Sequence, residues 1–306
     1  MPHPRSLRRA LTLVVVALSG LLSASSTASA APVVFGLGDQ SPAMFTDPLW
    51  TSQPLKNTRR IVDWDTPQYP AKVADLDAWM TAAHTAGATP LIAIEHSWTA
   101  GRLTLKPTVA QYTTLITWLK GRYPWWNTLT PWNEANYNSQ PTFRNPALAA
   151  QYWKAAKTAC VGCTVTSPSI VAWDGAPKKW LAQFQAATKN KVKLWAVHIY
   201  GDQNRLTDIH LKAFEKSVKG QIWVTEAAGW VRFTLPKWPI NQARAAKVIT
   251  YTFQVAKKHS ARVKRWYFYQ WRGPSSPLAT WDSGVLNPDG TTRPGYQALV
   301  AGLAGA

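Results

Sequence analysis

Short apolar runs alternate with longer amphipathic segments along the chain from residue 33 to the end. The short runs are nearly continuous in aliphatic and aromatic residues, a pattern typical of strands in a parallel sheet that is buried on both faces. We predict eight such strands: Val33–Gly38, Arg59–Trp64, Pro90–Glu95, Thr128–Trp132, Thr164–Ser169, Lys193–Ile199, Gln221–Thr225 and Arg265–Trp271.

The segments between these runs carry apolar residues at helical spacing, and several open at Asn, Thr or Pro, which suit helix starts. We predict helices over Ala71–Ala86, Val109–Lys120, Asn145–Ala159, Pro177–Ala187, Thr207–Val218, Asn241–His259 and Gly295–Leu303. The segment Asp47–Leu55 should be shorter, because Pro48 and Pro54 interrupt it.

Eight strand–helix pairs of roughly 34 residues each predict an α/β fold, the (β/α)₈ TIM barrel, as a single domain over residues 31–306. The alternative is a doubly wound open sheet that binds a dinucleotide. The first strand-to-helix turn, Gly36-Leu37-Gly38-Asp39-Gln40-Ser41, lacks the third glycine of that fingerprint. The pattern therefore favours the barrel.

Residues 1–30 have the features of a secretory signal peptide. A basic start with Arg5, Arg8 and Arg9 precedes an apolar stretch over Ala10–Leu22, and Ala28-Ser29-Ala30 fits the small-residue cleavage pattern. A membrane anchor is the alternative, but the apolar stretch is shorter than the roughly 20 residues that a bilayer requires. We predict a secreted protein that begins near Ala31 and has no membrane span.

The chain is strongly basic, with 34 Lys and Arg, 15 Asp and Glu, and a net charge of +19. This charge favours anionic partners such as acidic cell-wall material. The basic residues are scattered and no nucleic-acid-binding motif is present, so we expect no nucleic-acid partner. We also expect a monomer.

Two glutamates follow predicted strands of a chain that is poor in acids. Glu134 closes the fourth strand in Thr130-Pro131-Trp132-Asn133-Glu134, and Glu226 closes the seventh in Val224-Thr225-Glu226. The strand ends of a barrel meet at one mouth, where the active site lies. A carboxylate placed there is partly desolvated, which points to a function, although either glutamate alone could be a structural residue.

Trp132-Asn133-Glu134 after strand four, together with Val224-Thr225-Glu226 after strand seven, resembles the clan A glycoside hydrolases, a group of retaining (β/α)₈ glycosidases. The segment from Ser283 to Tyr296 is similar to the closing strand, loop and helix of such enzymes. The resemblance implies hydrolysis of O-glycosidic bonds in a poly- or oligosaccharide. It implies Glu134 as general acid/base and Glu226 as nucleophile, with no cofactor and no metal.

The resemblance also implies binding roles for other side chains. Asn133 would bind the sugar 2-hydroxyl, and an Arg near strand two, Arg59 rather than Arg60, would steady the nucleophile. Period two sends His198 and Tyr200 to the same side, where they would hold Glu226. A core His, a half-buried Tyr and an exposed Arg are the structural alternatives.

The chain contains 18 Trp, and aromatic faces at strand ends suit stacking on sugar rings. His96 follows strand three as a candidate substrate-binding residue, and Trp271, at the end of strand eight, is our predicted stacking platform. Further aromatic candidates are Trp98, Trp132, Trp230, Trp238 and Trp281.

Cys160 and Cys163 are the two cysteines of the chain, and in an oxidising compartment we expect them to form a local disulfide at a helix end. The function alternative to a glycosidase is a non-catalytic barrel that binds carbohydrate or cell wall, as the basic charge and the Trp content would allow. A surface protein held by charge is a weaker alternative.

Overall fold

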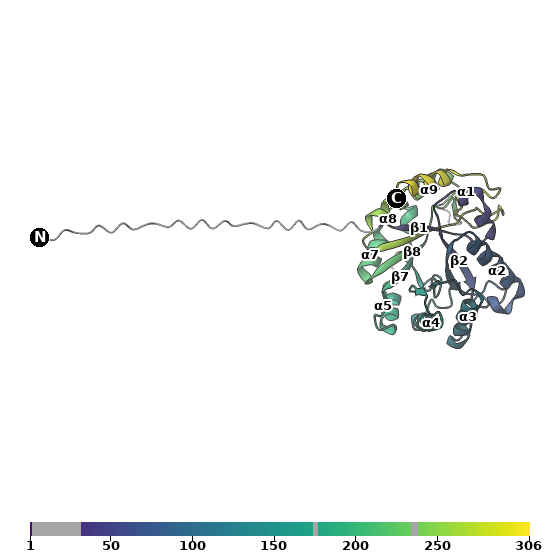
Figure 1. The fold of residues 1–306 in the computed structure, drawn as a ribbon, viewed down its shortest axis with the longest axis vertical. Helices are drawn as coiled ribbons and strands as arrows, with labels where there is room; N and C mark the ends of the chain where they lie inside the picture. Colours follow the sequence, from purple (N-terminus) through teal and green to yellow (C-terminus); the bar gives the residue numbers. More distant parts are fainter. Residues whose placement is uncertain (2–31, 174–176, 234–237) are drawn as a thin grey trace. The chain divides into compact units, whose positions relative to one another are not determined.

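The computed structural model describes residue 1 and residues 32–173, 177–233 and 238–306. The predicted signal peptide at residues 1–30 lies outside them, except for Met1. Strands alternate with helices from residue 34 onward, and the strands surround a common axis with the helices outside (Figure 1). The chain folds as a (β/α)₈ barrel, as predicted.

The strands lie within a few residues of their predicted bounds. They are β1 (Val34–Gly38), β2 (Asn57–Asp63), β3 (Thr89–Glu95), β4 (Thr128–Thr130), β5 (Thr164–Val165), β6 (Ser169–Val171), β7 (Leu194–His198), β8 (Gln221–Ala227) and β10 (Val263–Tyr269). All pairs in this sheet are parallel, in the order β5-β4-β3-β2-β1-β10-β8-β7-β6.

The predicted fifth strand is divided into β5 and β6, and this segment closes the ring. The Thr166 backbone N–H donates to Leu129 on β4, whereas that of Ser167 donates to Leu194 on β7. Pro168 follows and has no N–H to donate. One short segment therefore bonds to both neighbours, and its change of partner divides it into two strands.

The longer helices match the predictions closely. They are α2 (Pro70–Thr85), α3 (Val109–Arg122), α4 (Pro146–Ala159), α5 (Pro177–Ala187), α7 (Ile209–Ser217), α8 (Gln242–Lys258) and α9 (Pro294–Ala304). The proline-rich segment 42–51 forms two short turns, η1 (Pro42–Thr46) and α1 (Pro48–Thr51). Short elements that were not predicted are η2 (Thr66–Gln68), α6 (Tyr200–Asn204) and the pair β9 (Arg232–Phe233) with β11 (Trp281–Asp282).

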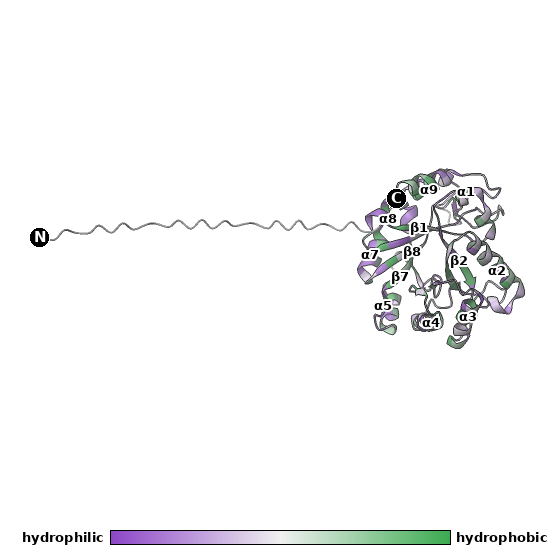
Figure 2. Ribbon diagram, in the orientation of Figure 1, coloured by the Kyte–Doolittle hydropathy of each residue, from purple (hydrophilic) through white to green (hydrophobic). Residues whose placement is uncertain are grey.

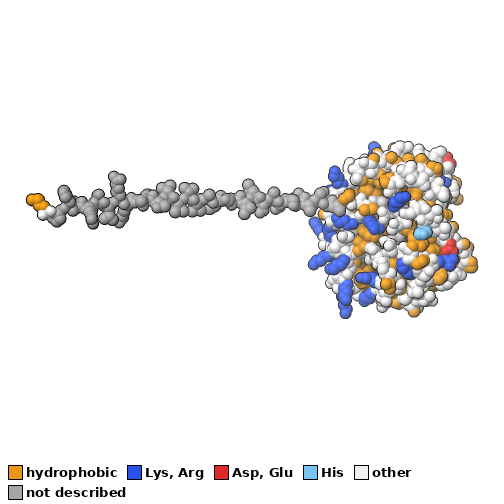
Figure 3. Space-filling model, in the orientation of Figure 1, with side chains coloured by type: hydrophobic (Ala, Val, Ile, Leu, Met, Phe, Trp, Pro, Cys, Tyr) orange, Lys and Arg blue, Asp and Glu red, His pale blue; other side chains and the backbone are white. Residues whose placement is uncertain are grey.

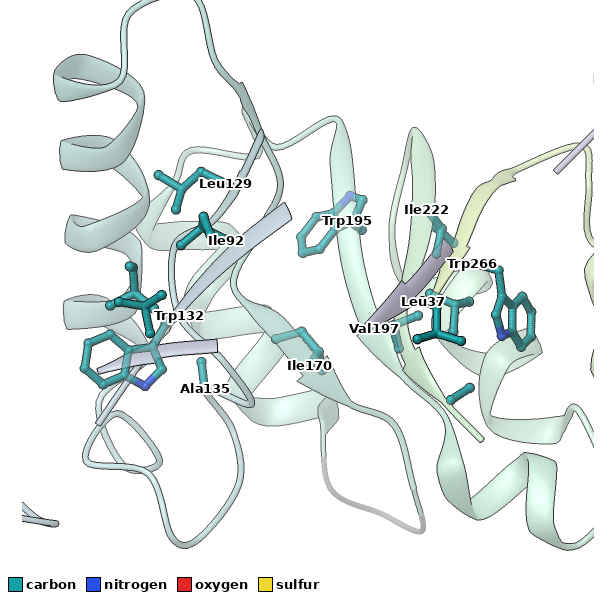
Figure 4. Packing of buried hydrophobic residues seen from close by; sticks show 14 of the residues in the cluster. Leu37, Ile92, Leu129, Trp132, Ala135, Ile170, Trp195, Val197, Ile222 and Trp266 are labelled. Carbon is teal, nitrogen blue, oxygen red and sulfur yellow. The ribbon is translucent and has the colours of Figure 1, made fainter. Parts of the chain in front are cut away.

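The helices carry hydrophobic and hydrophilic residues together (Figure 2). Buried apolar residues of the helices pack with strand residues in one large core. In α8, Ala245, Val248, Ile249 and Val255 recur at helical spacing and are buried. Figure 4 shows strand residues of the large core, including Ile92 from β3 and Trp266 from β10. This core therefore joins the strands to the outer helices.

A separate small cluster contains Leu91, Trp223 and Tyr267, each adjacent in sequence to a residue of the large core. Because successive strand residues point to opposite faces, these three side chains fill the barrel interior. Arg59 pairs with Leu91 in the β2–β3 register and belongs to this inner set. Gly36 makes room for Tyr267, since a Cβ at residue 36 would lie 2.8 Å from its ring.

Cys160 and Cys163 form the predicted disulfide at the end of α4. Gly162 between them has φ 79°, a left-handed conformation that favours glycine.

Every helix in the described ranges is too short or too polar to cross a membrane. Lysine and arginine side chains gather on the molecular surface over α5 and α7 (Figure 3). Exposed lysines of this region include Lys189, Lys191, Lys193, Lys216 and Lys219.

Candidate active site

The segment that carries Glu134 runs beyond β4 and is held from both sides. The backbone N–H of Asn133 donates to Ile94 on β3, at 2.6 Å, and that of Ala135 donates to Ser169 on β6, at 3.0 Å. The Glu134 N–H donates to the Ser169 hydroxyl at 2.8 Å. These bonds fix the direction of the Glu134 side chain at the mouth of the barrel.

Glu134 has φ 45°, in the left-handed region. A residue with a Cβ adopts this conformation at a cost of about 1–3 kcal/mol, and such residues concentrate at functional sites. The hydrogen bonds of residues 133–135 hold the backbone in this conformation.

Glu226 lies within β8 at a break in the strand register. Val197 pairs with Val224, but the next β7 residue, His198, pairs with Glu226, so β8 has one extra residue here. Bulges of this kind re-aim a side chain and occur next to active sites. The extra residue turns Glu226 toward His198.

The two glutamates meet as the sequence predicts, although they are 92 positions apart. An oxygen of Glu134, an oxygen of Glu226 and a ring nitrogen of His198 all lie within 4.8 Å of one another. His198 Nδ1 is 3.0 Å from Glu134 Oε1 and 3.7 Å from Glu226 Oε2. These three groups would also suit a divalent cation, but Arg59 already supplies a positive charge at Glu226.

Arg59 and Tyr200 hold Glu226 directly. Arg59 Nη1 forms an ion pair with Glu226 Oε1, and the Tyr200 hydroxyl donates to Oε2 at 2.8 Å. Burial opposes ionisation of Glu226. The charge of Arg59, the electrostatic attraction of His198 and the hydrogen bond from Tyr200 together outweigh burial, so the pKa of this carboxyl is lowered. The environment therefore favours an ionised Glu226.

Arg59, rather than Arg60, is the arginine at the site. Arg60 points outward, where its guanidinium pairs with Asp75 on α2. The alternation of the strand explains this division, because consecutive residues face opposite sides of the sheet.

Asn133 is buried beside the pair. Its Oδ1 accepts from Arg59 Nη2 at 2.7 Å and from the Ser169 hydroxyl at 3.2 Å. Tyr200 packs in an aromatic cluster that contains Trp230, Trp281 and neighbouring rings. The Trp281 ring lies edge-on to the Tyr200 ring, with 4.7 Å between the ring centroids. Trp230, Trp238 and Trp281 thus support Tyr200 through their packing.

Our prediction that Trp271 forms a stacking platform is wrong. Trp271 is 1% exposed, its Nε1 donates to Asp47, and its ring packs against Tyr296 on α9. Trp132 is likewise buried, stacked on Tyr152. β10 ends at Tyr269, two residues before Trp271, and Tyr269 lines a pocket described below.

Trp98 is the exposed aromatic side chain near the mouth, with 64% of its surface accessible. Its ring packs against His96, which is buried and has Nδ1 at 2.9 Å from Gln140 Nε2. The buried His96 ring therefore supports the exposed Trp98 ring through this contact. Trp98, Tyr269 and Glu95 line an open pocket of about 410 Å³.

Glu95 is a further acid of the site, which the sequence motifs do not single out although it follows an apolar strand as Glu134 and Glu226 do. It is an acid at the end of β3 and is 5% exposed. Burial raises the pKa of Glu95 to about 7; hydrogen bonds from Trp98 and Asn133 oppose this rise, and the charges of Glu134 and Glu226 add to it.

Residues 98–292 match the family model described as "Glycosyl hydrolase catalytic core". The chain belongs to this family. It is a glycosidase, and the predicted resemblance to clan A glycoside hydrolases is confirmed in family and fold. A search of curated proteins finds no match.

Several solved glycosidase structures share the fold of this glycosyl hydrolase. A GH5_18 protein from Streptomyces cattleya in complex with GlcNAc is 17% identical, with a TM-score of 0.69 over 90% of this chain and 80% of the other. A GH10 endoxylanase from a sugarcane soil metagenome is 14% identical, with a TM-score of 0.64 over 88% of this chain and 96% of the other. A family 39 glycoside hydrolase from Bacteroides cellulosilyticus WH2 is 14% identical, with a TM-score of 0.61 over 89% of this chain and 64% of the other.

Proposed function

We propose that this glycosyl hydrolase cleaves a poly- or oligosaccharide by double displacement with retention of configuration, with Glu226 as nucleophile and Glu134 as general acid/base. The observation that carries the proposal is that one carboxylate oxygen of Glu134 and one of Glu226 lie within 4.8 Å of each other. Retaining enzymes hold their carboxyls about 5–5.5 Å apart, whereas inverting enzymes need about 6.5–9.5 Å to admit a water. The observed spacing favours direct attack by one carboxylate.

The environments of the two glutamates support the division of roles. The Glu226 side chain is 7% exposed and bound by Arg59 and Tyr200, so its charge and direction are fixed for attack on the anomeric carbon. The Glu134 side chain is 22% exposed and has a hydrogen bond with His198. Its greater access to solvent suits a group that exchanges protons with a leaving group and with water.

In the first step, a Glu226 oxygen bonds to the anomeric carbon as the glycosidic bond breaks, and Glu134 gives its proton to the leaving oxygen. The covalent ester removes the negative charge of Glu226. Glu134, now a carboxylate, then takes a proton from water, which attacks the anomeric carbon and displaces Glu226. Arg59 and Tyr200 stabilise the carboxylate that is released.

The roles can be tested with Glu226→Ala and Glu134→Ala on a panel of aryl glycosides and polysaccharides. We expect each substitution to abolish turnover. Azide should restore activity to Glu226→Ala as a glycosyl azide of inverted configuration, because the small anion enters the space of the lost carboxylate. Full activity in either variant would contradict the assignment. Saccharide binding by the wild type without hydrolysis of any panel member would instead support a non-catalytic barrel.

We further propose that the protein is secreted and that its basic surface contacts anionic cell-wall polymer. The signal-like sequence at residues 1–30 and the exposed lysines around Lys189–Lys193 support this proposal. Residues 31–306 should sediment with cell-wall preparations at low salt and be released by moderate salt. Retention that does not respond to salt would contradict a contact based on charge.

A further inference from the structure

Glu95 forms hydrogen bonds both to Asn133, beside the glutamate pair, and to Trp98, at the pocket. Its Oε2 accepts from Asn133 Nδ2 and from Gln140 Nε2, each at 3.2 Å. Its Oε1 accepts from the Trp98 indole Nε1 at 2.7 Å. One buried carboxylate therefore holds a buried amide next to the glutamate pair and an exposed ring at the pocket.

The amide of Asn133 is held in one orientation. Its oxygen faces the donors Arg59 and Ser169, and its nitrogen faces the acceptor Glu95. Rotation of the amide by half a turn would place N–H groups against donors and oxygen against a carboxylate. One of the two Nδ2 hydrogens is taken by Glu95, which leaves the other for a ligand.

We propose that Glu95 is a positioning residue that aims the free Nδ2 hydrogen of Asn133 at the C2 hydroxyl of the bound sugar and fixes Trp98 as the stacking surface beside it. This inference rests on the proposed function, because it takes the cleaved sugar to lie between Glu134 and Glu226. It adds a third carboxylate to the site, one that forms no bond to the substrate.

A carboxylate suits this role better than an amide. Glu95 receives N–H groups from three side chains, and both of its oxygens accept. A glutamine would offer one acceptor oxygen and would set its own NH₂ group against a donor. Charged and titratable groups around Glu95 include Glu134, Glu226 and Tyr269. His96 Nδ1 lies 3.6 Å from Glu95 Oε2, and Asp63 and Lys72 line the same pocket as Glu95.

The link between Glu95 and Trp98 can be tested without substrate. Protein labelled with 5-fluorotryptophan gives a fluorine NMR signal for each Trp, and Trp98→Phe assigns the signal of Trp98. In the wild type we expect this signal to shift with a transition in the neutral pH range, as Glu95 ionises. Glu95→Gln should abolish the transition. Asp75→Asn should keep it, because Asp75 lines the same pocket but bonds to Arg60.

The effect on recognition is tested with an aryl glycoside and its 2-deoxy analogue. The wild type should prefer the 2-hydroxy substrate in kcat/KM, and Glu95→Gln should reduce that preference by about tenfold, the equivalent of one hydrogen bond. Glu95→Asp, which keeps the charge, should retain part of it. Asp75→Asn should leave it unchanged.

Equal loss on both substrates, or a Trp98 signal that does not respond to Glu95→Gln, would overturn the inference. A wild type that hydrolyses no glycoside would refute the proposed function, and the fluorine titration would then decide the Glu95–Trp98 link by itself. The two failures are therefore distinguishable.

Discussion

Arg59 and Glu226 form an ion pair with side chains only 1% and 7% exposed, although 167 residues separate them in sequence. Arg59 also donates to Asn133, so it connects the ends of β4 and β8 through the barrel interior. Removal of one partner from a buried pair leaves an uncompensated charge, which costs about 3–5 kcal/mol.

Arg59→Met should therefore destabilise the protein and raise the pKa of Glu226, because the attraction that lowers it is lost. The acidic limb of the pH profile of kcat/KM reports the ionisation of the nucleophile, so it should move to higher pH. Arg60→Met is the matched control from the same strand. A profile that stays in place in Arg59→Met would contradict the role of Arg59.

Tyr200→Phe removes the hydroxyl that donates to Glu226 Oε2. We expect kcat to fall by roughly tenfold or more, since a hydrogen bond to a charged group contributes about 1.5–3 kcal/mol. Tyr152→Phe is the control, because its hydroxyl donates to the Pro107 carbonyl. A similar loss of kcat in both variants would mean that the effect is structural.

Glu95 should make stability depend on pH. Its pKa in the folded state is about 7, against an ordinary value of 4.5, so the folded state keeps a proton that the unfolded state releases. Stability from Glu95 is greatest below pH 4.5 and decreases as the pH rises to about 7, by about 3 kcal/mol. Glu95→Gln should remove most of this decrease. Urea unfolding at pH 5 and pH 8 measures it, and an unchanged difference between the two pH values would refute it.

The disulfide closes a very short loop, so its contribution should be modest. Cys160→Ser with Cys163→Ser should lower the free energy of unfolding by roughly 2 kcal/mol and leave kcat unchanged. Thermal unfolding and activity assays check this. Loss of activity at temperatures where the variant is folded would contradict a purely structural role.

The sequence predicts the eight strands well because most are nearly continuous apolar runs, and it points to Glu134 and Glu226 because both lie in motifs that resemble those of the clan A glycoside hydrolases. The division of β5 from β6 could not be predicted, since it depends on which neighbour each backbone group meets. Trp271 does not lie at the mouth because β10 ends at Tyr269, two residues earlier than predicted, and the Trp271 side chain is buried. Glu95 also stands at the end of an apolar strand, but it lies outside the motifs that carry the family resemblance, so the sequence does not distinguish it.

If Glu134 and Glu226 act in turn on one anomeric carbon, hydrolysis retains the configuration of that carbon. Proton NMR of the first product formed from a substrate of known configuration tests it most directly, because the anomer is read before mutarotation. We expect the first product to have the configuration of the substrate. A first product of inverted configuration would contradict it.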